Sequence, residues 1–231
     1  MVGENRNTLR IISPDEVANK LRYDYAHCES DLECKRLDAI VRVLRGLQKQ
    51  PFRLDEFLNE TAQFIYRQLN IQSLSISVKD VDGKFRYHAF AGLRKASEEA
   101  LKKCVYSEHE LFDPSKYPHT TISVYTKLFL AENNPYAPGE EETYNRPLML
   151  QQTRKEIDDS IEGDYLDILI FDSKNEVCGY IEISGTKDGK LPDAKTIKWL
   201  EVTGSIIGFG IQMDRMERAS RRHIIMPDKD V

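Results

Sequence analysis

The chain of 231 residues has no apolar run long enough to cross a membrane. A membrane-spanning helix needs about 20 consecutive apolar residues, and the longest such stretch here, residues 202–213, is well short of that. The N-terminus also lacks the apolar segment that forms the centre of a secretory signal. We therefore expect no membrane partner and a cytoplasmic location.

Cysteine is scarce, with four in the whole chain. In a chain of this length without a secretory signal, that number favours reduced thiols over a disulfide framework. His27, Cys28 and Cys34 lie close together in the sequence. Their spacing does not match the ligand pattern of a structural zinc site. The sequence therefore predicts reduced cysteines and no metal site.

Common enzyme motifs are missing as well. The sequence contains no phosphate-binding glycine loop, no nucleophile elbow around a serine and no metalloprotease helix. The net charge of −5 argues against nucleic acid as a partner. Four arginines near the C-terminus are typical of a basic helix end, which complements the helix dipole; they are Arg215, Arg218, Arg221 and Arg222. We expect a protein that is not an enzyme.

Helices are predicted in the first 70 residues. Ser13, Pro14 and Glu16 form a helix-start signal, with a capping serine, a proline at the first position and a glutamate three residues after the cap. That helix should extend to about Tyr25, and two longer ones are predicted over 31–48 and 54–69. The second helix carries a narrow apolar stripe, formed by Leu37, Ile40, Leu44 and Leu47.

Two β-hairpins follow at separate places in the chain. The first pairs residues 73–79 with 85–91 around a turn that contains Gly83, and the second pairs 166–171 with 177–184 around a polar turn. A long helix should then begin at Pro192, because a proline at the first helical position loses no hydrogen bond. Antiparallel hairpins separated by a long segment predict an α+β fold with a central antiparallel sheet.

The segment between the hairpins, 105–163, is harder to assign. Residues 94–104 should be helical, 120–124 and 127–131 extended, and 132–147 a long loop. Loops of that length are uncommon in compact domains and are often functional. A solvated insertion without a role in chemistry is the alternative.

The strands divide into an apolar face and a mixed face. Leu74, Ile76 and Val78 alternate with serines, and corresponding apolar positions recur in the second hairpin. Helices should cover that apolar face, and the 105–163 segment should cover the mixed face. We expect the mixed face to be the floor of a ligand pocket. Its candidate ligand-binding residues are Ser75, Arg86, His88, Phe90, Asp167, Cys178, Tyr180 and Glu182. The alternative is a solvated face on which Arg86 pairs with Glu182.

The closing helix contains Gly204 and Gly208 on one side, where they let another backbone approach closely. Apolar residues occupy several of its faces, which predicts burial on two sides. One side would face the sheet. The other would face the Leu37–Leu47 stripe, or its copy in a second subunit, as in a symmetric homodimer.

The order of these elements resembles a GAF domain, a small-molecule sensor module of signalling proteins. The segments that carry the resemblance are Leu54–Leu58, Ser73–Val78 followed by Asp82 and Gly83, Tyr165–Phe171, Val177–Ile183 and Trp199–Met213. It implies an antiparallel sheet with terminal helices on one face, a ligand pocket on the other, and dimerisation through terminal helices. The chain then divides into an N-terminal helical extension (1–50), the GAF-like domain (51–216) and a basic tail (217–231). The 132–163 segment is longer than in a typical member.

Three functions fit these observations. The main hypothesis is a non-catalytic sensory or regulatory domain that binds a small molecule and signals through a helix-mediated dimer, with a partner protein supplying the output. The resemblance names no ligand or cofactor, because no motif for cyclic nucleotides, bilin or haem is recognisable. One alternative is a redox enzyme of the free methionine sulfoxide reductase type acting through Cys178, although the paired cysteines of that branch are missing. The other is a ligand-free dimerisation scaffold.

Overall fold

The computed structural model describes residues 12–28, 31–134, 136 and 139–225, with side chains as far as residue 221. It divides into two compact units, Met1–Asp38 and Ala39–Val231. Helix α2 (Leu32–Gly46) contributes to both units. Because its second half packs with the larger unit, this division lies earlier in the chain than the expected boundary at residue 50.

The first unit contains α1 (Pro14–Cys28). The Ser13 hydroxyl accepts a hydrogen bond from the Glu16 backbone N–H at 3.2 Å, and the Glu16 carboxylate accepts one from the Ser13 N–H at 3.0 Å. These reciprocal bonds confirm the predicted helix start.

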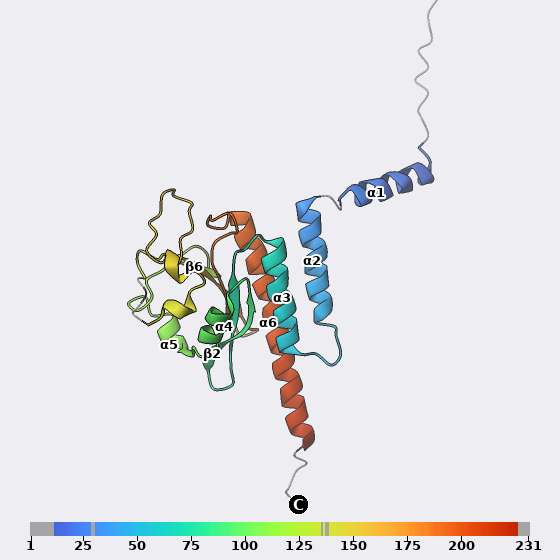
Figure 1. Cartoon of the computed structure of the whole chain (residues 1–231). Coiled ribbons are helices and arrows are strands. Elements are labelled where there is room, and N and C mark those ends of the chain that lie inside the picture. Colours follow the sequence, from blue (N-terminus) through green and yellow to red (C-terminus); the bar gives the residue numbers. More distant parts are fainter. Residues whose placement is uncertain (1–11, 29–30, 135, 137–138, 226–231) are drawn as a thin grey trace, which may run out of the picture. The chain divides into compact units, whose positions relative to one another are not determined.

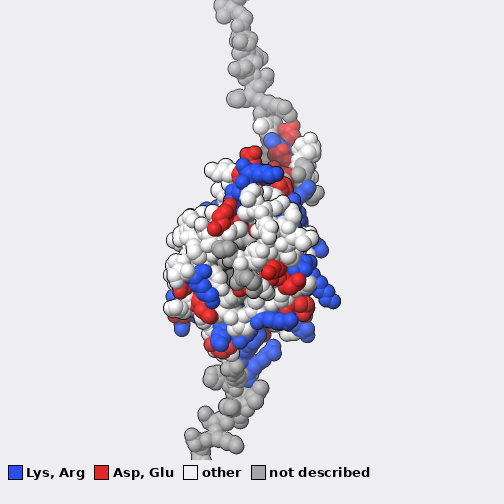
Figure 2. Space-filling view, turned by 60° about the vertical axis from the view of Figure 1, so that its left-hand side comes forward, with Lys and Arg blue, Asp and Glu red and all other residues white. Residues whose placement is uncertain are grey.

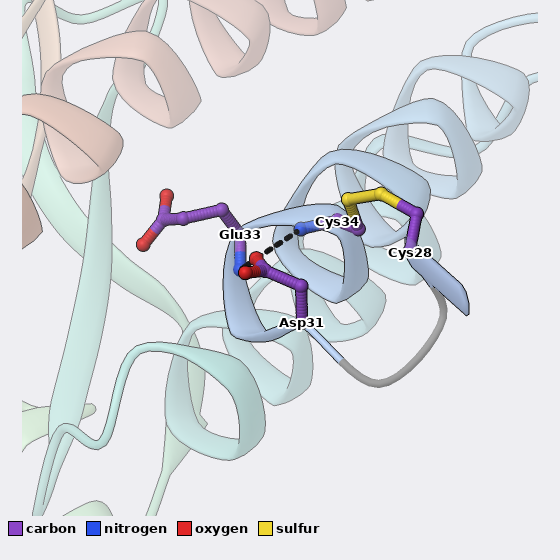
Figure 3. Close-up of a disulfide and its surroundings, with 4 residues drawn as sticks. All are labelled: Cys28, Asp31, Glu33 and Cys34. Atoms are coloured by element: carbon purple, nitrogen blue, oxygen red, sulfur yellow. Dashed lines mark hydrogen bonds between the residues drawn. A yellow bond between two sulfur atoms is a disulfide. The ribbon is translucent and has the colours of Figure 1, made fainter. Parts of the chain in front are cut away.

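A disulfide joins the end of α1 to the start of α2 (Figure 3). It links Cys28 to Cys34, whose Cα atoms are 5.9 Å apart. The Asp31 carboxylate caps α2 by accepting hydrogen bonds from the backbone N–H groups of Glu33 and Cys34. The expectation of four reduced cysteines is therefore wrong for this pair, because the fold brings together two residues that sequence spacing alone did not pair. The free cysteines are Cys104 and Cys178.

The second unit is built on one antiparallel sheet of seven strands in the order β3-β2-β1-β7-β6-β5-β4. The strands are β1 (Leu74–Lys79), β2 (Lys84–Ala91), β3 (Tyr106–Ser107), β4 (Thr120–Thr121), β5 (Thr126–Phe129), β6 (Tyr165–Phe171) and β7 (Val177–Ile183). Both predicted hairpins are present, and β1 pairs directly with β7, so they share one sheet. The predicted α+β class is confirmed.

Helices α3 (Leu54–Gln68) and α6 (Ala194–Ile225) lie side by side on one face of this sheet (Figure 1). The main core lies beneath them and contains the apolar residues that alternation assigned to this face, among them Ile76, Ile168 and Ile181. A Cβ added at Gly208 would lie 2.7 Å from the Phe171 carbonyl oxygen. This glycine therefore lets α6 approach β6 closely, as predicted.

Short elements cover the opposite face (Figure 1). They are α4 (Lys95–Leu101), α5 (Glu108–Leu111) and the 3-10 helices η1 (Glu141–Thr143) and η2 (Pro147–Met149). A second apolar cluster lies under them, built around Phe85, Tyr180 and Leu169. The sheet therefore has helices on one face and the 105–163 segment on the other.

Helix α6 differs from its prediction at its start and in its burial, and it extends into the predicted basic tail. The helix begins at Ala194, not at Pro192, because the Asp193 carboxylate caps it by accepting a hydrogen bond from the Thr196 N–H at 2.7 Å. The helix continues to Ile225, so it includes the first residues of the predicted basic tail (217–231). One side of α6 is not buried, since Phe209 is 65% exposed.

The surface carries mixed charge. Figure 2 shows Lys and Arg intermingled with Asp and Glu on the face that it presents, without a large patch of one sign. None of the helices in the described part of the chain combines the length and apolar character that crossing a bilayer requires.

Candidate functional site

A cavity of about 230 Å³ lies between the sheet and the 105–163 segment. Its floor comes from β1, β2 and β7, through Ser75, Tyr87 and Glu182, and the covering segment supplies much of the rest. The lining residues from that segment are Tyr106, Tyr117, Glu140, Thr143, Tyr144, Asn145, Arg146, Ser160, Ile161, Glu162 and Gly163. The predicted placement of a cavity beneath this segment is thus found.

A smaller cavity of about 50 Å³ adjoins the first. The two share Tyr87, Tyr106, Tyr117, Tyr165 and Glu182. The smaller one extends across the sheet towards β5 and β6, where Phe129 and Asp167 line it. Together they form one recess with aromatic walls and two carboxyl groups on its floor.

The two carboxyl groups lie on neighbouring strands. Asp167 of β6 is directly opposite Glu182 of β7, and Glu182 is opposite Ser75 of β1. Side chains in such cross-strand pairs point to the same face and lie within contact range. Glu182 accepts a hydrogen bond from the Tyr87 hydroxyl at 2.7 Å and a long one from the Ser75 hydroxyl at 3.5 Å.

Burial makes both carboxyl groups harder to ionise. Removal from water raises the pKa of Asp167 well above its usual value, and repulsion from Glu182 adds to the effect, while Lys127 opposes it. Burial also raises the pKa of Glu182, against the lowering effect of its hydrogen bonds from Tyr87 and Ser75. Asp167 is 2% exposed, and its Oδ1 has no hydrogen-bond partner among the described residues.

Buried and half-buried tyrosines surround these carboxyl groups. Burial is the main cause that raises the pKa of the Tyr87, Tyr106 and Tyr165 hydroxyls, and the charge of Glu182 adds to it in each case. In Tyr144 the same causes, together with Glu140, raise the pKa to about 12. These tyrosines therefore remain neutral hydrogen-bond donors at physiological pH.

Hydrogen bonds fasten the covering segment to the start of α4. The Arg94 backbone N–H donates to the Asn145 side chain at 2.7 Å, and the Ser97 hydroxyl donates to the Tyr144 carbonyl at 2.7 Å. The Arg94 guanidinium also donates to the carboxylate of Glu142 at 2.9 Å. These contacts hold η1 over the cavity, so the segment is part of the folded wall.

A buried ion pair fastens the other end of this segment. Asp164 has a fully buried side chain that accepts hydrogen bonds from the Arg154 guanidinium at 2.9 Å and from the backbone N–H groups of Ala131 and Ile161. Arg154 also pairs with Glu132 and donates to the Asp159 carbonyl. This network explains why a segment longer than is usual in compact domains can still be ordered.

Three of the predicted site residues line the recess: Ser75, Asp167 and Glu182. Tyr180 and Phe90 also face this side, but they pack in the second apolar cluster and line neither cavity. The Tyr180 ring is fully buried, with its centroid 5.8 Å from that of Phe85. The prediction that Tyr180 and Phe90 line the pocket is therefore wrong, and they instead support its floor.

Arg86 and His88 lie on the helix-covered face, so their predicted position is wrong. The pairing of β1 with β2 shifts by one residue, since Ile76 pairs with Ala89 and Ser77 with Tyr87. His88 is the extra residue of this β-bulge, which reverses the alternation. His88 Nδ1 lies 3.0 Å from the Asp55 carboxylate on α3. Arg86 binds Asp80 and Asp82 next to the turn, not Glu182.

Cys178 is displaced by a second bulge. Ile170 pairs with Gly179 and Phe171 with Val177, which leaves Cys178 as the extra residue. It is 1% exposed and packs in the main core on the helix side. Burial raises the pKa of its thiol to about 11. Cys178 therefore does not line the recess.

Several lining residues were not predicted. Tyr87 was missed because the bulge at His88 places it on the opposite face from the one that alternation indicates. Tyr106, Tyr117, Tyr144 and Tyr165 were missed as site residues. One sequence feature could have indicated them. Tyrosine is frequent in and beside the 105–163 segment, which was expected to lie over the mixed face of the sheet.

Comparisons with solved structures point to one fold. The chain is similar to the GAF domain of a phosphoenolpyruvate-protein phosphotransferase from Coxiella burnetii, with a TM-score of 0.51, 16% identity and coverage of 80% of this chain and 96% of that one. It is also similar to the A. aeolicus NLH2 GAF domain in an inactive state, with a TM-score of 0.51, 14% identity and coverage of 79% and 99%. The chain has a GAF-like fold.

The GAF-like fold matches these domains in shape and not in sequence. A methyl-accepting chemotaxis protein gives a further match, with a TM-score of 0.51, 11% identity and coverage of 77% of this chain and 99% of that one. No family model matches the sequence, and no curated protein matches it. At identities this low, the structural matches establish only the fold of the GAF-like unit. Its ligand has to be inferred from its own residues.

Proposed function

We propose that this chain is a sensory or regulatory domain that binds a small molecule in the recess and signals through its helices. The observation that carries the proposal is the cavity itself. It has tyrosine walls, buried carboxyl groups and a cover fastened at both ends. Concave sites in which a few polar groups converge are typical of small-molecule binding.

Strand β6 provides a physical route from the recess to α6. Tyr165 and Asp167 of β6 line the recess, while the intervening Leu166 and the following Ile168 belong to the core under the helices. A Cβ at Gly204 of α6 would lie 3.5 Å from Ile168. A ligand that contacts β6 differently in two states would therefore act on a strand that also supports α6.

The exposed side of α6 supports dimerisation. Val202, Phe209 and Met216 recur at every seventh residue and are 46%, 65% and 63% exposed. This spacing keeps them on one side of the helix, at one of the two apolar positions that a coiled-coil heptad uses. We infer that the stripe packs against the same stripe of a second copy and so forms a homodimer. A signalling partner would bind according to the geometry of that dimer.

The redox alternative loses its main support in this geometry. A nucleophilic cysteine needs a low thiol pKa and access to substrate. Cys178 is buried among apolar residues away from the recess, with a raised pKa. Cys178→Ser should therefore leave ligand binding unchanged, and loss of sulfoxide-reducing turnover in this variant would instead favour the enzyme.

A thermal-shift screen against nucleotides, amino acids, amines and other metabolites tests the proposal. A ligand present at 100 times its Kd should add about 2.7 kcal/mol to the stability of the fold. Each hit is then measured on Leu93→Trp, which adds bulk to the cavity wall, and on Leu148→Trp, a matched change at a residue that is 99% exposed.

Loss of the shift in Leu93→Trp alone would support the sensor. A shift that survives Leu93→Trp would place the ligand elsewhere. A screen without hits would favour the dimerisation scaffold.

A further inference from the structure

The charged groups around the recess are mostly acidic. Among the described residues that line either cavity, the single basic side chain is Arg146, and its Nε already donates to the Glu162 carboxylate at 2.8 Å. Asp164 is likewise neutralised by Arg154. On the floor of the recess, neither Asp167 nor Glu182 forms such an ion pair with a described basic side chain.

Asp167 is a buried carboxyl group whose loss of contact with water is not fully offset by hydrogen bonds. Its Oδ1 has no hydrogen-bond partner in the described part of the chain, although the side chain lines the smaller cavity. Lys127 is its cross-strand neighbour on β5, but the Lys127 Nζ lies over the Phe112 ring, 4.5 Å from its centroid. An unpaired buried carboxylate costs free energy, and a ligand that brings a positive charge recovers part of it.

Two aromatic rings next to Glu182 pack edge to face. The Tyr87 and Tyr106 rings are perpendicular, with an interplanar angle of 89° and centroids 6.4 Å apart. Tyr87 is held in this position by its hydrogen bond to Glu182. Aromatic faces carry negative partial charge and attract cations, most strongly in sites that exclude water.

Resting on the proposed function, we propose that the ligand of this recess is a small organic ammonium ion. When such a cation binds, its charge favours the ionised forms of Glu182 and Asp167, which then supply the opposite charge, and the rings of Tyr87 and Tyr106 pack against the cationic group. The volume of about 230 Å³ restricts the ligand to a compact molecule. Phosphates and other anions find no unpaired basic side chain among the described lining residues, since Arg146 already binds Glu162.

The test compares a cation with a neutral molecule of the same shape. Choline and 3,3-dimethylbutan-1-ol are titrated into the full chain by isothermal calorimetry, with ethanolamine as an ammonium ion that also donates N–H hydrogen bonds. We expect at least one of the two cations to bind about tenfold or more tightly than the neutral alcohol, because the rings and carboxyl groups attract a cation most strongly where water is excluded.

Variants then identify the groups that bind the cation. Glu182→Gln should weaken the binding of that cation about tenfold or more. Glu176→Gln, the same change at an exposed residue of the β6–β7 turn, should leave it unchanged. Near-ultraviolet circular dichroism of each variant shows whether the aromatic packing is retained.

Two results would overturn the inference about the ligand. The first is equal affinity for the cations and the neutral alcohol, or no binding of any of them. The second is undiminished cation binding in a folded Glu182→Gln variant. Neither result contradicts the sensor proposal if the thermal-shift screen finds another ligand whose binding Leu93→Trp abolishes. Failure of the ammonium proposal is therefore distinguishable from failure of the sensor proposal.

Discussion

Buried acidic side chains on the cavity side of the sheet differ in how they are paired. Asp164 accepts hydrogen bonds from a guanidinium and two backbone N–H groups, so its charge is fully compensated. Asp167 has an oxygen without a partner among the described residues. The first arrangement stabilises the covering segment, whereas the second keeps a costly group beside a cavity.

Replacing Asp164 should therefore be strongly destabilising. Asp164→Ala leaves the mostly buried Arg154 without its buried partner and two backbone N–H groups unsatisfied, so we expect a loss of about 3–5 kcal/mol in the free energy of unfolding. Asp158→Ala is the matched control, since the Asp158 side chain is 62% exposed and Lys190 keeps its bond to Asp159. Its loss should stay below about 1 kcal/mol. Urea unfolding of both variants measures the difference, and equal losses would contradict the role given to Asp164.

Asp167→Asn should change how stability depends on pH. The raised pKa of Asp167 means that the folded state binds more protons than the unfolded state above about pH 4. The contribution of Asp167 to the free energy of unfolding therefore falls as the pH rises through the pKa that Asp167 has in the folded state. Asparagine does not ionise, so the variant lacks this fall. The variant should match the wild type near pH 4 and exceed it increasingly towards pH 8. Thermal unfolding over this range checks the sign, and parallel profiles would show that Asp167 is not held in its neutral form.

Asp82 should affect the pH dependence of stability in the opposite direction to Asp167. Hydrogen bonds from Arg86 lower the pKa of this exposed carboxyl group to about 2. Its stabilising effect is present above about pH 4 and is lost as pH falls towards 2. Asp82→Asn therefore makes a useful comparison for the Asp167 profile.

At the scale of elements, α6 depends on glycines that differ in their surroundings. Gly208 faces the Phe171 carbonyl oxygen of β6, where an added Cβ would lie at 2.7 Å. Gly204 faces apolar side chains, with Ile168 at 3.5 Å and Ile170 at 3.7 Å from an added Cβ, which are ordinary contact distances. One glycine therefore sets how closely the helix meets the sheet, and the other does not.

Alanine substitutions at these two positions should have opposite effects. Gly208→Ala should destabilise the fold by about 1–3 kcal/mol, because the clash outweighs the better helix propensity of alanine. Gly204→Ala should stabilise it by up to about 1 kcal/mol, since the methyl group finds room and helix propensity improves. Guanidinium unfolding of both variants measures the two changes. Stabilisation by Gly208→Ala would show that α6 can move away from β6 at little cost.

The strands also explain which site residues were predictable. Ser75, Asp167 and Glu182 pair directly with one another across β1, β6 and β7, so alternation located them correctly. Arg86, His88 and Cys178 lie in or beyond bulges in β2 and β7, where one extra residue reverses the alternation. A bulge depends on contacts between strands, and a single strand sequence does not display it.

At the scale of the whole molecule, the prediction concerns the exposed apolar stripe of Val202, Phe209 and Met216 along α6, which we expect to be buried in a dimer. Phe209→Glu places a charge in the middle of the stripe, so we expect the protein to become monomeric with its thermal stability per chain little changed. Ile157→Glu is the control, because Ile157 is 94% exposed on the covering segment. Size-exclusion chromatography with light scattering measures the mass of each variant. A wild-type monomer at high micromolar concentration would end the dimer proposal.

The sequence by itself determined the order of helices and hairpins, the single antiparallel sheet and its apolar face, because these follow from local periodicity, capping residues and turn residues. Only the tertiary structure decided which polar side chains meet in the recess. The bulges at His88 and Cys178 moved predicted residues out, and the folded 105–163 segment brought in Tyr106, Tyr117 and Tyr144. The physical reason is that a cavity is formed by segments distant in the chain, whose contacts depend on strand register and packing and not on local pattern.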